Sequence, residues 1–426
     1  IRDSFGKDNR WGYFPSASLA WRMSEENFMK GLNWLDNLKI RLSYGVTGNN
    51  QISDYGAIGL LGYTTYVKNG ALAQGIYTNT LPDPELRWEK TGQVNFGLDA
   101  SLFNNRIHWS LDLYYSKTRD LLLDVPIPVL TGFRSTLTNV GKLENRGVEF
   151  LLSTRNIDNG DFLWTTDFNI SANRNKVLKL GANNAPIMVT NNDAISKTEV
   201  GQPVGNYFGY VFDGVLSQAD IDKGIPVYPG SEAGDPKVRD VNKDGKINAD
   251  DRTIIGNYQP DFTWGMTNNF SYKGFELSIM LSGSQGGEIM NQQARFTKIF
   301  NNNRNAYKSV ANFWRSDENP GDGSTFKPRV VQNTVQAQSS TYWVEDGSFV
   351  RIKNIRLGYN FPSSILRKCR LTNLKLYVNM ENIHVFSDYP NFDPESSTYQ
   401  SGYLVGYDYG AYPNPFTATV GINLSF

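Results

Sequence analysis

The sequence predicts an all-β protein, built as a transmembrane antiparallel up-and-down β-barrel with long loops on one side. Three observations indicate this fold class. Residues alternate strictly between apolar and polar in segment after segment. Short and long connections between those segments alternate along the whole chain. The composition is rich in aromatic residues, glycine and asparagine and poor in helix-favouring stretches, which is typical of β-proteins with many turns.

The last eleven residues, 416–426, show the alternation most clearly. One set of alternating positions is apolar throughout, while the other holds only glycine and small polar residues. The apolar set is Phe416, Ala418, Val420, Ile422, Leu424 and Phe426. Successive side chains of a strand point to opposite faces, so this segment is a two-faced strand. Its length also suits a tilted strand that crosses a bilayer, which needs about 9–11 residues.

Ten further segments repeat this pattern. They are residues 13–23, 38–44, 94–102, 107–116, 146–155, 162–173, 262–271, 274–284, 349–359 and 373–383. Near Lys353 and Asn354 the alternation slips by one residue, which predicts a β-bulge. The sequence therefore predicts about eleven strands.

The connections distinguish a membrane barrel from a soluble sandwich, because both would bury one face of each strand. Tight turns are expected near 103–106, 156–161 and 272–273, with medium links at 24–37 and 361–372. Long links at 50–92, 119–144, 174–261, 285–348 and 384–415 fall between them. A barrel with turns on one rim and large loops on the other has this regularity, as outer-membrane barrels do.

The parity of the connections also predicts direction. If the short turns face the periplasm, the first strand runs inward and residues 1–12 begin in an extracellular loop. The chain is then expected to be the C-terminal part of a larger barrel, whose first strand would pair with 416–426.

Charge and composition exclude several classes of function. Lysine plus arginine and aspartate plus glutamate both number 42, and the basic residues are dispersed, so no nucleic-acid partner is expected. The two histidines, His108 and His384, lack a cluster at metal-ligand spacing. The single cysteine, Cys369, cannot form an internal disulfide. No catalytic residue is predicted, so the protein is not expected to be an enzyme.

The longest loop, 174–261, contains the strongest local motif, residues 240–251. The motif fits a calcium-binding loop of the EF-hand or dockerin type, in which alternate residues of a tight turn bring oxygen ligands to one point. The predicted ligands are Asp240, Asn242, Asp244, Lys246 through its backbone carbonyl, Asn248 directly or through water, and Asp251. We expect a structural Ca²⁺ here; the alternative is a solvated Asp-Gly turn without an ion.

Two other residues of the motif have structural roles. Gly245 permits the sharp turn at the sixth position, and Ile247 is expected to anchor the loop in apolar surroundings. Asp251 stands where such loops usually carry glutamate, and its shorter side chain makes bidentate coordination less certain.

Several stretches resemble the SusC/RagA-type TonB-dependent transporters. They are residues 5–22 (FGKDNRWGYFPSASLAWR), 200–214 (VGQPVGNYFGYVFDG), the ion loop through Asn257, and 343–359 (WVEDGSFVRIKNIRLGY). Asn382, the segment from Phe392 to Glu395, and the terminal phenylalanine complete the set. The resemblance covers essentially the whole chain, with the motifs in family order.

The resemblance implies an outer-membrane barrel of 22 strands in a Gram-negative, Bacteroidota-like bacterium. Such proteins import oligosaccharides or peptides, usually with a SusD-like surface lipoprotein, and TonB supplies energy through an N-terminal box. The resemblance further implies that this chain holds about eleven C-terminal strands, without the plug, the TonB box or the first part of the barrel. The expected partners are therefore that N-terminal plug and barrel half, TonB, the lipoprotein, membrane lipid and the substrate; no substrate-binding residue is named.

The sequence also allows a second class of protein. A secreted or surface β-rich glycan-binding or adhesion protein with a dockerin-like calcium loop would share the alternation and the motif. It would be soluble without detergent, with its apolar faces packed against each other, whereas the barrel exposes an apolar band about 25 Å tall to lipid.

Overall fold

The fold was obtained as a computed structural model that describes residues 5–133, 135–191, 194–299, 305–328, 335–399 and 402–426. The chain forms two compact units that interleave along the sequence. Unit 1 comprises Ile1–Arg155, Asn169–Ile187 and Thr198–Val204, and unit 2 comprises Asn156–Phe168, Met188–Lys197 and Gly205–Phe426.

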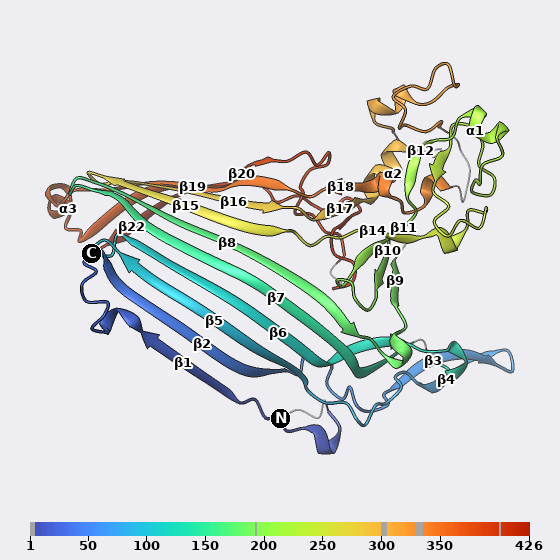
Figure 1. Cartoon of the computed structure of the whole chain (residues 1–426), viewed down its shortest axis with the longest axis horizontal. Helices are drawn as coiled ribbons and strands as arrows, with labels where there is room; N and C mark the ends of the chain where they lie inside the picture. The colour runs from blue at the N-terminus through green and yellow to red at the C-terminus, as the bar shows by residue number, and fades with distance from the viewer. Residues whose placement is uncertain (1–4, 134, 192–193, 300–304, 329–334, 400–401) are drawn as a thin grey trace. The chain divides into compact units, whose positions relative to one another are not determined.

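Unit 1 is built on long antiparallel strands that lie side by side (Figure 1). They are β1 (Ser16–Arg22), β2 (Leu35–Asn49), β5 (Glu89–Leu102), β6 (Ile107–Pro126) and β7 (Ser135–Asp158). Strand β8 (Phe162–Lys179) is divided between the two units. The register is continuous over most of each pair, and the β6–β7 pair shifts only near Leu121.

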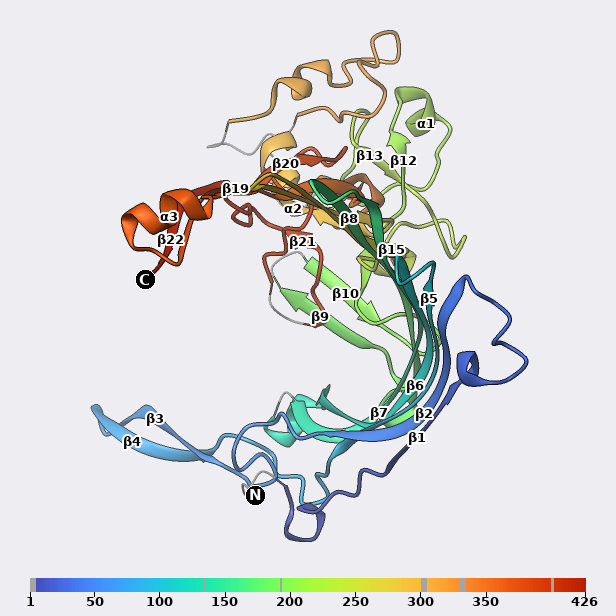
Figure 2. The same cartoon turned by 90° about the vertical axis from the view of Figure 1, so that its left-hand side faces the viewer.

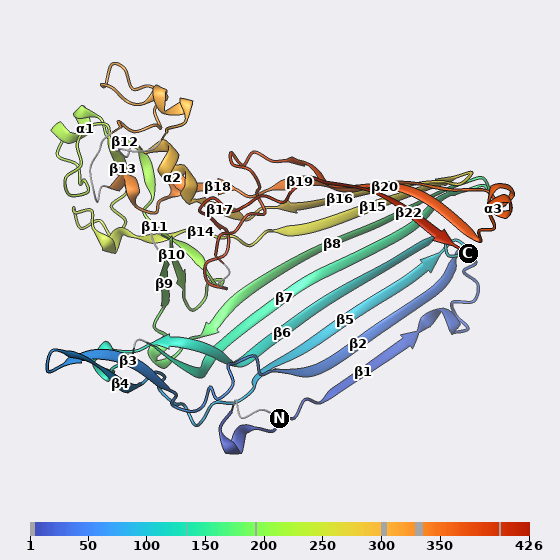
Figure 3. The ribbon, with the colours of Figure 1, turned by 180° about the vertical axis from the view of Figure 1, so that it is seen from behind.

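Unit 2 contains the remaining long strands, which also lie side by side (Figure 3). They are β15 (Phe262–Tyr272), β16 (Phe275–Gln285), β19 (Phe349–Asn360), β20 (Asn373–Phe386) and β22 (Thr417–Ser425). Each strand pairs antiparallel with the next one in this series.

The predicted fold class and all eleven predicted strands are confirmed within the described residues. The strands form one antiparallel sheet in the order β1-β2-β5-β6-β7-β8-β15-β16-β19-β20-β22. Each connects to its neighbour in sequence order, which is the up-and-down topology. Several strands are longer than predicted, because β2, β6 and β7 continue into segments whose alternation is weaker.

The predicted bulge is also present. Between Met280 and Leu281 the register against β19 advances from Asn354 to Ile352, so Lys353 is the extra residue. The opposite neighbour β20 carries a second irregularity at the same height, where Asn382 has a φ of 51°. There β20 passes from Glu381 to His384, so Asn382 and Ile383 stand against the single extra residue Lys353 of β19.

The strand register sorts the side chains into two faces, which we call the apolar face and the polar face. In unit 1, one row across β2, β5, β6 and β7 is Leu42, Phe96, Leu113 and Val148, and the next row on the opposite face is Arg41, Gly97, Asp112 and Glu149. In unit 2, the corresponding rows across β15, β16, β19, β20 and β22 are Phe270, Leu277, Leu357, Val378 and Val420, then Asn269, Ser278, Arg356, Asn379 and Thr419.

The connections between long strands contain their own secondary structure. In unit 2 a small sheet has the order β14-β11-β10-β9, with strands Thr253–Gly256, Asn206–Gly209, Ala194–Thr198 and Ile187–Asn191; the end residues Ile187 and Thr198 belong to unit 1. Two further sheets join β12 (Phe212–Val215) to β13 (Pro236–Val238), and β17 (Glu288–Asn291) to β18 (Val344–Asp346) and β21 (Tyr407–Asp408). The long links are therefore folded rather than irregular.

The helices are short. They are α1 (Gln218–Asp222), α2 (Gln292–Lys298) and α3 (Ser363–Cys369), with 3-10 turns at Lys7–Asn9, Met23–Glu25, Val129–Thr131, Ala182–Asn184, Ala249–Asp251, Lys308–Asn312, Val335–Ala337 and Thr341–Trp343. Helix α3 fills the medium link between β19 and β20. Among the described residues, no helix has both the length and the apolar character needed to cross a membrane.

The β2–β5 connection carries a separate two-stranded ribbon, β3 (Leu61–Lys68) and β4 (Ala71–Thr78). Asn69 and Gly70 join the two strands with φ values of 53° and 75°, as a tight hairpin turn requires. Figure 2 shows the ribbon extending away from β2 and β5. Most of its side chains are exposed on both faces.

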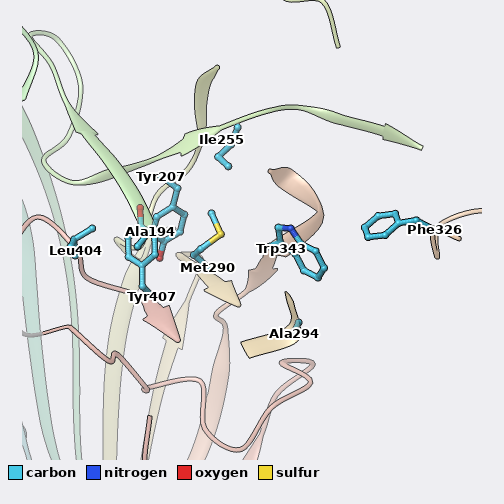
Figure 4. Close-up of a cluster of buried hydrophobic side chains, with 9 residues drawn as sticks. All are labelled: Ala194, Tyr207, Ile255, Met290, Ala294, Phe326, Trp343, Leu404 and Tyr407. Atoms are coloured by element: carbon cyan, nitrogen blue, oxygen red, sulfur yellow. The ribbon is translucent and has the colours of Figure 1, made fainter. Parts of the chain in front are cut away.

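The largest apolar core of unit 2 lies among its connecting segments. Nine buried residues form it: Ala194, Tyr207, Ile255, Met290, Ala294, Phe326, Trp343, Leu404 and Tyr407 (Figure 4). The Tyr207 hydroxyl donates to the backbone oxygens of Glu288 and Gly406, at 2.7 and 2.9 Å. Burial raises the pKa of Tyr207 well above its ordinary value. These bonds tie three distant segments together, so the loops of unit 2 form a packed body.

Candidate functional site

The polar face of unit 1 carries a group of four charged side chains, which we call the inner charge cluster: Lys39, Arg41, Asp99 and Asp112. The Arg41 guanidinium donates to both oxygens of Asp99, each at 2.8 Å. It also donates to both oxygens of Asp112, at 3.0 and 2.9 Å. Lys39 Nζ lies 2.9 Å from Asp99. Two cations therefore balance two carboxylates.

The geometry of the inner charge cluster depends on Gly97, which lies between Arg41 and Asp112 in the strand register. A Cβ atom built on Gly97 would lie 2.4 Å from Cζ of Arg41. The missing side chain thus lets the guanidinium lie flat over β5 and reach the next strand. Ser110 and Asn95 donate further hydrogen bonds to the same carboxylate oxygens that Arg41 contacts, at 2.8–3.1 Å. The cluster is closed, with its charges paired within the chain.

The polar face of unit 2 is open by contrast, since it lines a hollow of about 590 Å³. Side chains from several strands border it, among them Thr165, Asn269, Ser278, Glu276, Asn354, Arg356, Lys375 and Asn379. Lys375 pairs with Glu276, and Asn360 donates to the same carboxylate at 2.6 Å. Arg356 stacks its guanidinium 4.5 Å from the ring centre of Tyr377. Such a mixture of amides, hydroxyls and charges suits polar ligands or a polar protein surface.

A buried ion pair fixes the last loop of unit 2. Arg351, at the end of β19, and Asp393 are 3% and 2% exposed, and their side chains are 2.6 Å apart. Asp393 also accepts hydrogen bonds from the backbone of Glu395 and from the backbone and side chain of Asn414, all at 3.0 Å. Burial alone would raise the pKa of Asp393, but these bonds and Arg351 outweigh it and lower the pKa below its ordinary value.

The predicted calcium ligands lie along one tight loop between β13 and the turn Ala249–Asp251. The Asp240 carboxylate accepts from the backbone N–H groups of Asp244 and Gly245, at 3.2 and 2.9 Å. Asn242 accepts from the same Asp244 N–H at 3.0 Å, and Asp244 accepts from Lys246 at 2.9 Å. The side-chain oxygens of Asp240, Asn242 and Asp244, at positions one, three and five, thus all accept hydrogen bonds from backbone N–H groups within the loop.

The second half of the motif has a different geometry. Asn248 accepts from the backbone of Asp250, and Asp251 is fully buried and accepts from the backbone of Val241 and Asn248, at 2.9 and 2.8 Å. Ile247 is buried against Tyr210, Val238 and Val335, as expected of an anchor. Gly245 has the positive φ, 82°, that its turn requires.

The donor types fit a hard cation better than a soft one. All are carboxylate, amide or carbonyl oxygens, which are the ligands that Ca²⁺ takes. Within the part of the chain that the structure describes, no three His, Cys, Asp or Glu side chains come together as a metal site by themselves. A site here would therefore also need the oxygens of Asn242 and Asn248 and the Lys246 carbonyl.

The sequence pattern alone assigns no functional role to any residue of the inner charge cluster or of the hollow, although Asn354 of the hollow lies at the predicted bulge. Each side chain had been placed on a polar face by its alternation, but pairing across strands depends on register. Gly97 was the one available signal, because a glycine within an otherwise well-formed strand often marks a close approach.

Comparisons with known proteins agree with this architecture over the whole chain. The sequence model of the family described as TonB dependent receptor-like, beta-barrel matches residues 2–383. TonB-dependent receptor P3 of Formosa agariphila is 36% identical over 99% of this chain and 43% of its own length. TonB-dependent receptor SusC of Bacteroides thetaiotaomicron is 32% identical over 99% of this chain and 41% of its own length.

A solved structure gives the same result in three dimensions. The structure of the RagAB peptide transporter superimposes with a TM-score of 0.82 and 28% identity, covering 100% of this chain and 44% of that one. The chain spans less than half the length of the relatives it matches.

Proposed function

Because the chain belongs to the β-barrel family of TonB-dependent receptors, we propose that it works as the C-terminal barrel part of an outer-membrane importer of SusC/RagA type. The imported substrates would be oligosaccharides or peptides, and TonB would supply the energy. The membrane would be the outer membrane of a Gram-negative, Bacteroidota-like bacterium, in keeping with the organisms of the relatives.

The observation that carries this proposal is the chemical division of the sheet. Rows such as Phe270, Leu277, Leu357, Val378 and Val420 contain no polar group, and many of their side chains are exposed. Val420 is 77% exposed on an apolar face, which would be unfavourable in water and favourable against lipid. The opposite face, with its charges and amides, suits an aqueous lumen.

In this function the chain makes and breaks no bond. The polar face would form part of the lumen wall, where the amides and charges around the unit 2 hollow would meet either a polar substrate or a plug. The edge strands β1 and β22 would pair with strands of an N-terminal barrel half, because unpaired backbone groups in lipid cost several kcal/mol each.

An uptake assay on the full-length protein tests the proposal. Cells would be offered labelled oligosaccharides and labelled peptides, with and without TonB, and accumulation measured. We expect accumulation of one substrate class that disappears without TonB. Equal accumulation with and without TonB would contradict the proposal, and so would a detergent-free, monodisperse protein; the latter would favour a secreted glycan-binding protein.

The partner at the cell surface is proposed to be a SusD-like lipoprotein that contacts the β3–β4 ribbon. Tyr63, Val67 and Leu72 are 79%, 69% and 80% exposed on this ribbon, which lies on the side of the long loops. The three share one face of the ribbon, because Val67 pairs with Leu72 and Tyr63 lies four residues before Val67, and an exposed apolar face of a projecting hairpin marks an interaction site.

Co-purification measures this contact. Replacing Tyr63 and Leu72 together by serine is expected to release the lipoprotein from the full-length transporter, while the barrel stays folded. A matched control is Tyr412→Ser, which removes an aromatic ring that is 89% exposed in a different loop. Retention of the lipoprotein by the double variant would contradict the assignment.

We further propose that residues 240–251 bind Ca²⁺ as a structural ion. Asp240, Asn242, Asp244, the Lys246 carbonyl, Asn248 and Asp251 would provide the oxygens. The support is the turn itself, which already directs three of these side chains inward, and the burial of Ile247 beneath it. The ion would lower the repulsion among the carboxylates and stiffen the loop.

Calcium binding can be measured directly by isothermal titration with the full-length protein. Asp240→Ala and Asp244→Ala should each abolish binding, and chelator should speed proteolysis of the 240–251 segment in the wild type only. The matched control is Asp222→Ala, on α1 outside the motif. Equal heat from wild type and both variants would exclude the site.

A further inference from the structure

Three cations lie in one row on the apolar face of unit 1. Lys90 on β5 is directly opposite Arg119 on β6, and Arg119 is directly opposite Lys142 on β7. We call Lys90, Arg119 and Lys142 the cation row. Adjacent strands are about 4.8 Å apart, so the three Cα atoms fall within about 10 Å. A fourth cation, Lys117, lies one row below.

The chain provides no counter-charge for the cation row. Like charges directly opposite each other on neighbouring strands are destabilising. Among the described residues, none of the three side chains makes a hydrogen bond or ion pair. The fourth position of the row, on β2, is Gly48, and a Cβ there would collide with the Phe14 ring. In the row below, Glu144 is directly opposite Lys117 and accepts from the Tyr115 hydroxyl at 2.8 Å, so this carboxylate faces Lys117 rather than the three cations of the row.

The height of the row on the strand is informative. Lys90 is twelve residues from Leu102, where β5 meets its short turn. At about 3.4 Å per residue and a tilt of about 40°, the row stands roughly 31 Å above that turn, just beyond an apolar band about 25 Å tall. This is the depth of the outer-leaflet headgroups, if the short turns face the periplasm as proposed above.

A hollow of about 500 Å³ adjoins the row on the same face. It is bordered by Tyr44, Val94 and Tyr115 on its apolar side and by Lys117, Arg119 and Lys142 on its charged side. Lys117 Nζ lies 5.3 Å from the ring centre of Tyr115. The hollow thus offers apolar and aromatic surface towards the membrane centre and positive charge towards the outside. An amphipathic anion, with its charge above its apolar part, matches that order.

We propose that this surface binds a phosphorylated glycolipid of the outer leaflet, with a phosphate held by the cation row and Lys117. The sugar ring would lie over Tyr44 and Tyr115, and the acyl chains would continue down the apolar rows below. The bound phosphate provides the counter-charge that the chain lacks. The proposal rests on the membrane orientation given above, but not on any particular transported substrate.

A lipid-binding measurement on the full-length transporter in detergent tests it. The probe is phosphorylated lipid A, compared with the same lipid A after phosphatase treatment and with inorganic phosphate alone, read by native mass spectrometry. The variant replaces Lys90, Arg119 and Lys142 by glutamine. The matched control replaces Lys68, Lys223 and Lys308, three exposed lysines outside the long barrel strands, by glutamine.

We expect the phosphorylated lipid to bind the wild type and the control equally. The cation-row variant should lose roughly 100-fold in affinity, since each of its three basic residues near a membrane surface contributes about 1 kcal/mol, or about fivefold. Equal binding of the dephosphorylated lipid, unchanged binding by the variant, or equally tight binding of inorganic phosphate would each overturn the proposal. A change of oligomeric state in the variant instead would assign the face to a second protein copy. Because binding is read in detergent, its failure is distinct from a failure of uptake.

Discussion

The two charged groups on unit 1 lie on opposite faces of the sheet, share strands β5 and β6, and are balanced in opposite ways. In the inner charge cluster, Arg41 is held by two carboxylates and every charge has a partner within the chain. In the cation row, three positive groups stand side by side without any carboxylate. Both groups use the same strand register and similar residue types. The difference lies only in which face, and which depth, each row occupies.

This contrast shows where the counter-ion comes from. A group enclosed by the protein must find its partner in the chain, because an unpaired charge removed from water is costly. A group at a lipid headgroup surface can take its partner from the environment. The faces of the sheet therefore differ in the source of their counter-charge as well as in polarity.

The ion pair of Arg351 and Asp393 is also formed within the chain, but both of its side chains are buried. Breaking it should therefore cause the largest loss of stability. Asp393→Ala removes the buried partner of Arg351 and leaves only the partly exposed Glu395, 2.8 Å from the guanidinium, so the last loop should lose about 3 kcal/mol of local stability. Hydrogen exchange of the Glu395 and Asn414 amides, which donate to Asp393, measures this loss.

The same pair predicts a pH dependence. The pKa of Asp393 is lower in the folded protein than its ordinary value of 3.8, so its stabilisation is fully present above that value. It is lost as the pH falls through the lower, folded pKa. Glu395→Gln, which removes the partly exposed carboxylate 2.8 Å from Arg351, is the comparison and should have a smaller effect than Asp393→Ala. Unchanged exchange in Asp393→Ala would contradict this account of the loop.

The inner charge cluster should give the next largest effect. Arg41→Ala leaves Asp99 and Asp112 without their shared donor, and because these groups are partly exposed we expect a loss of about 2 kcal/mol. Gly97→Ala should act in the same direction, since its Cβ would displace the guanidinium, and the two changes should not be additive.

The urea midpoint of the folded barrel in detergent provides the measurement. Gly92→Ala is the matched control on the same strand, because a Cβ there meets nothing closer than 3.5 Å. Additive losses in the Arg41→Ala, Gly97→Ala double variant would mean that Gly97 is not needed to make room for the Arg41 guanidinium.

Substitution in the cation row should change the stability of the barrel least, and it should increase rather than decrease that stability. In detergent free of anionic lipid, Arg119→Gln removes repulsion from both neighbours and should stabilise the barrel by up to about 0.5 kcal/mol. Arg119→Lys keeps the charge and should leave the unfolding midpoint unchanged. A clear destabilisation by Arg119→Gln would show that the row is balanced by the protein itself.

The strands could be predicted from sequence because each carries its own two-faced pattern. The segment 416–426 needs no partner to show which side chains share a face, and Lys353 marked its bulge by a slip of one position. The turn-forming residues Asn104 and Gly160 indicated the tight connections near 103–106 and 156–161. These features are local, so a single segment contains the information.

Contacts that depend on register or on distant segments could not be predicted in this way. Arg41 and Asp112 are 71 residues apart and meet only because a third strand places Gly97 between them. The cation row likewise appears only when three strands are aligned. Within the loops, the Tyr207 hydroxyl donates to the backbone oxygen of Gly406, 199 residues away, and no sequence pattern near either residue predicts this hydrogen bond.

The most direct test of the account is a spin-label scan along β6, from His108 to Arg119, in the full-length protein reconstituted into bilayers, with Cys369 replaced by serine. Accessibility to oxygen reports lipid, and accessibility to a water-soluble nickel complex reports water. We predict that Trp109, Leu111, Leu113 and Tyr115 contact lipid, that their even-numbered neighbours contact water, and that the lipid signal ends at Lys117 and Arg119. Equal accessibility to the nickel complex at odd and even positions would contradict the division of the sheet into a lipid face and a lumen face.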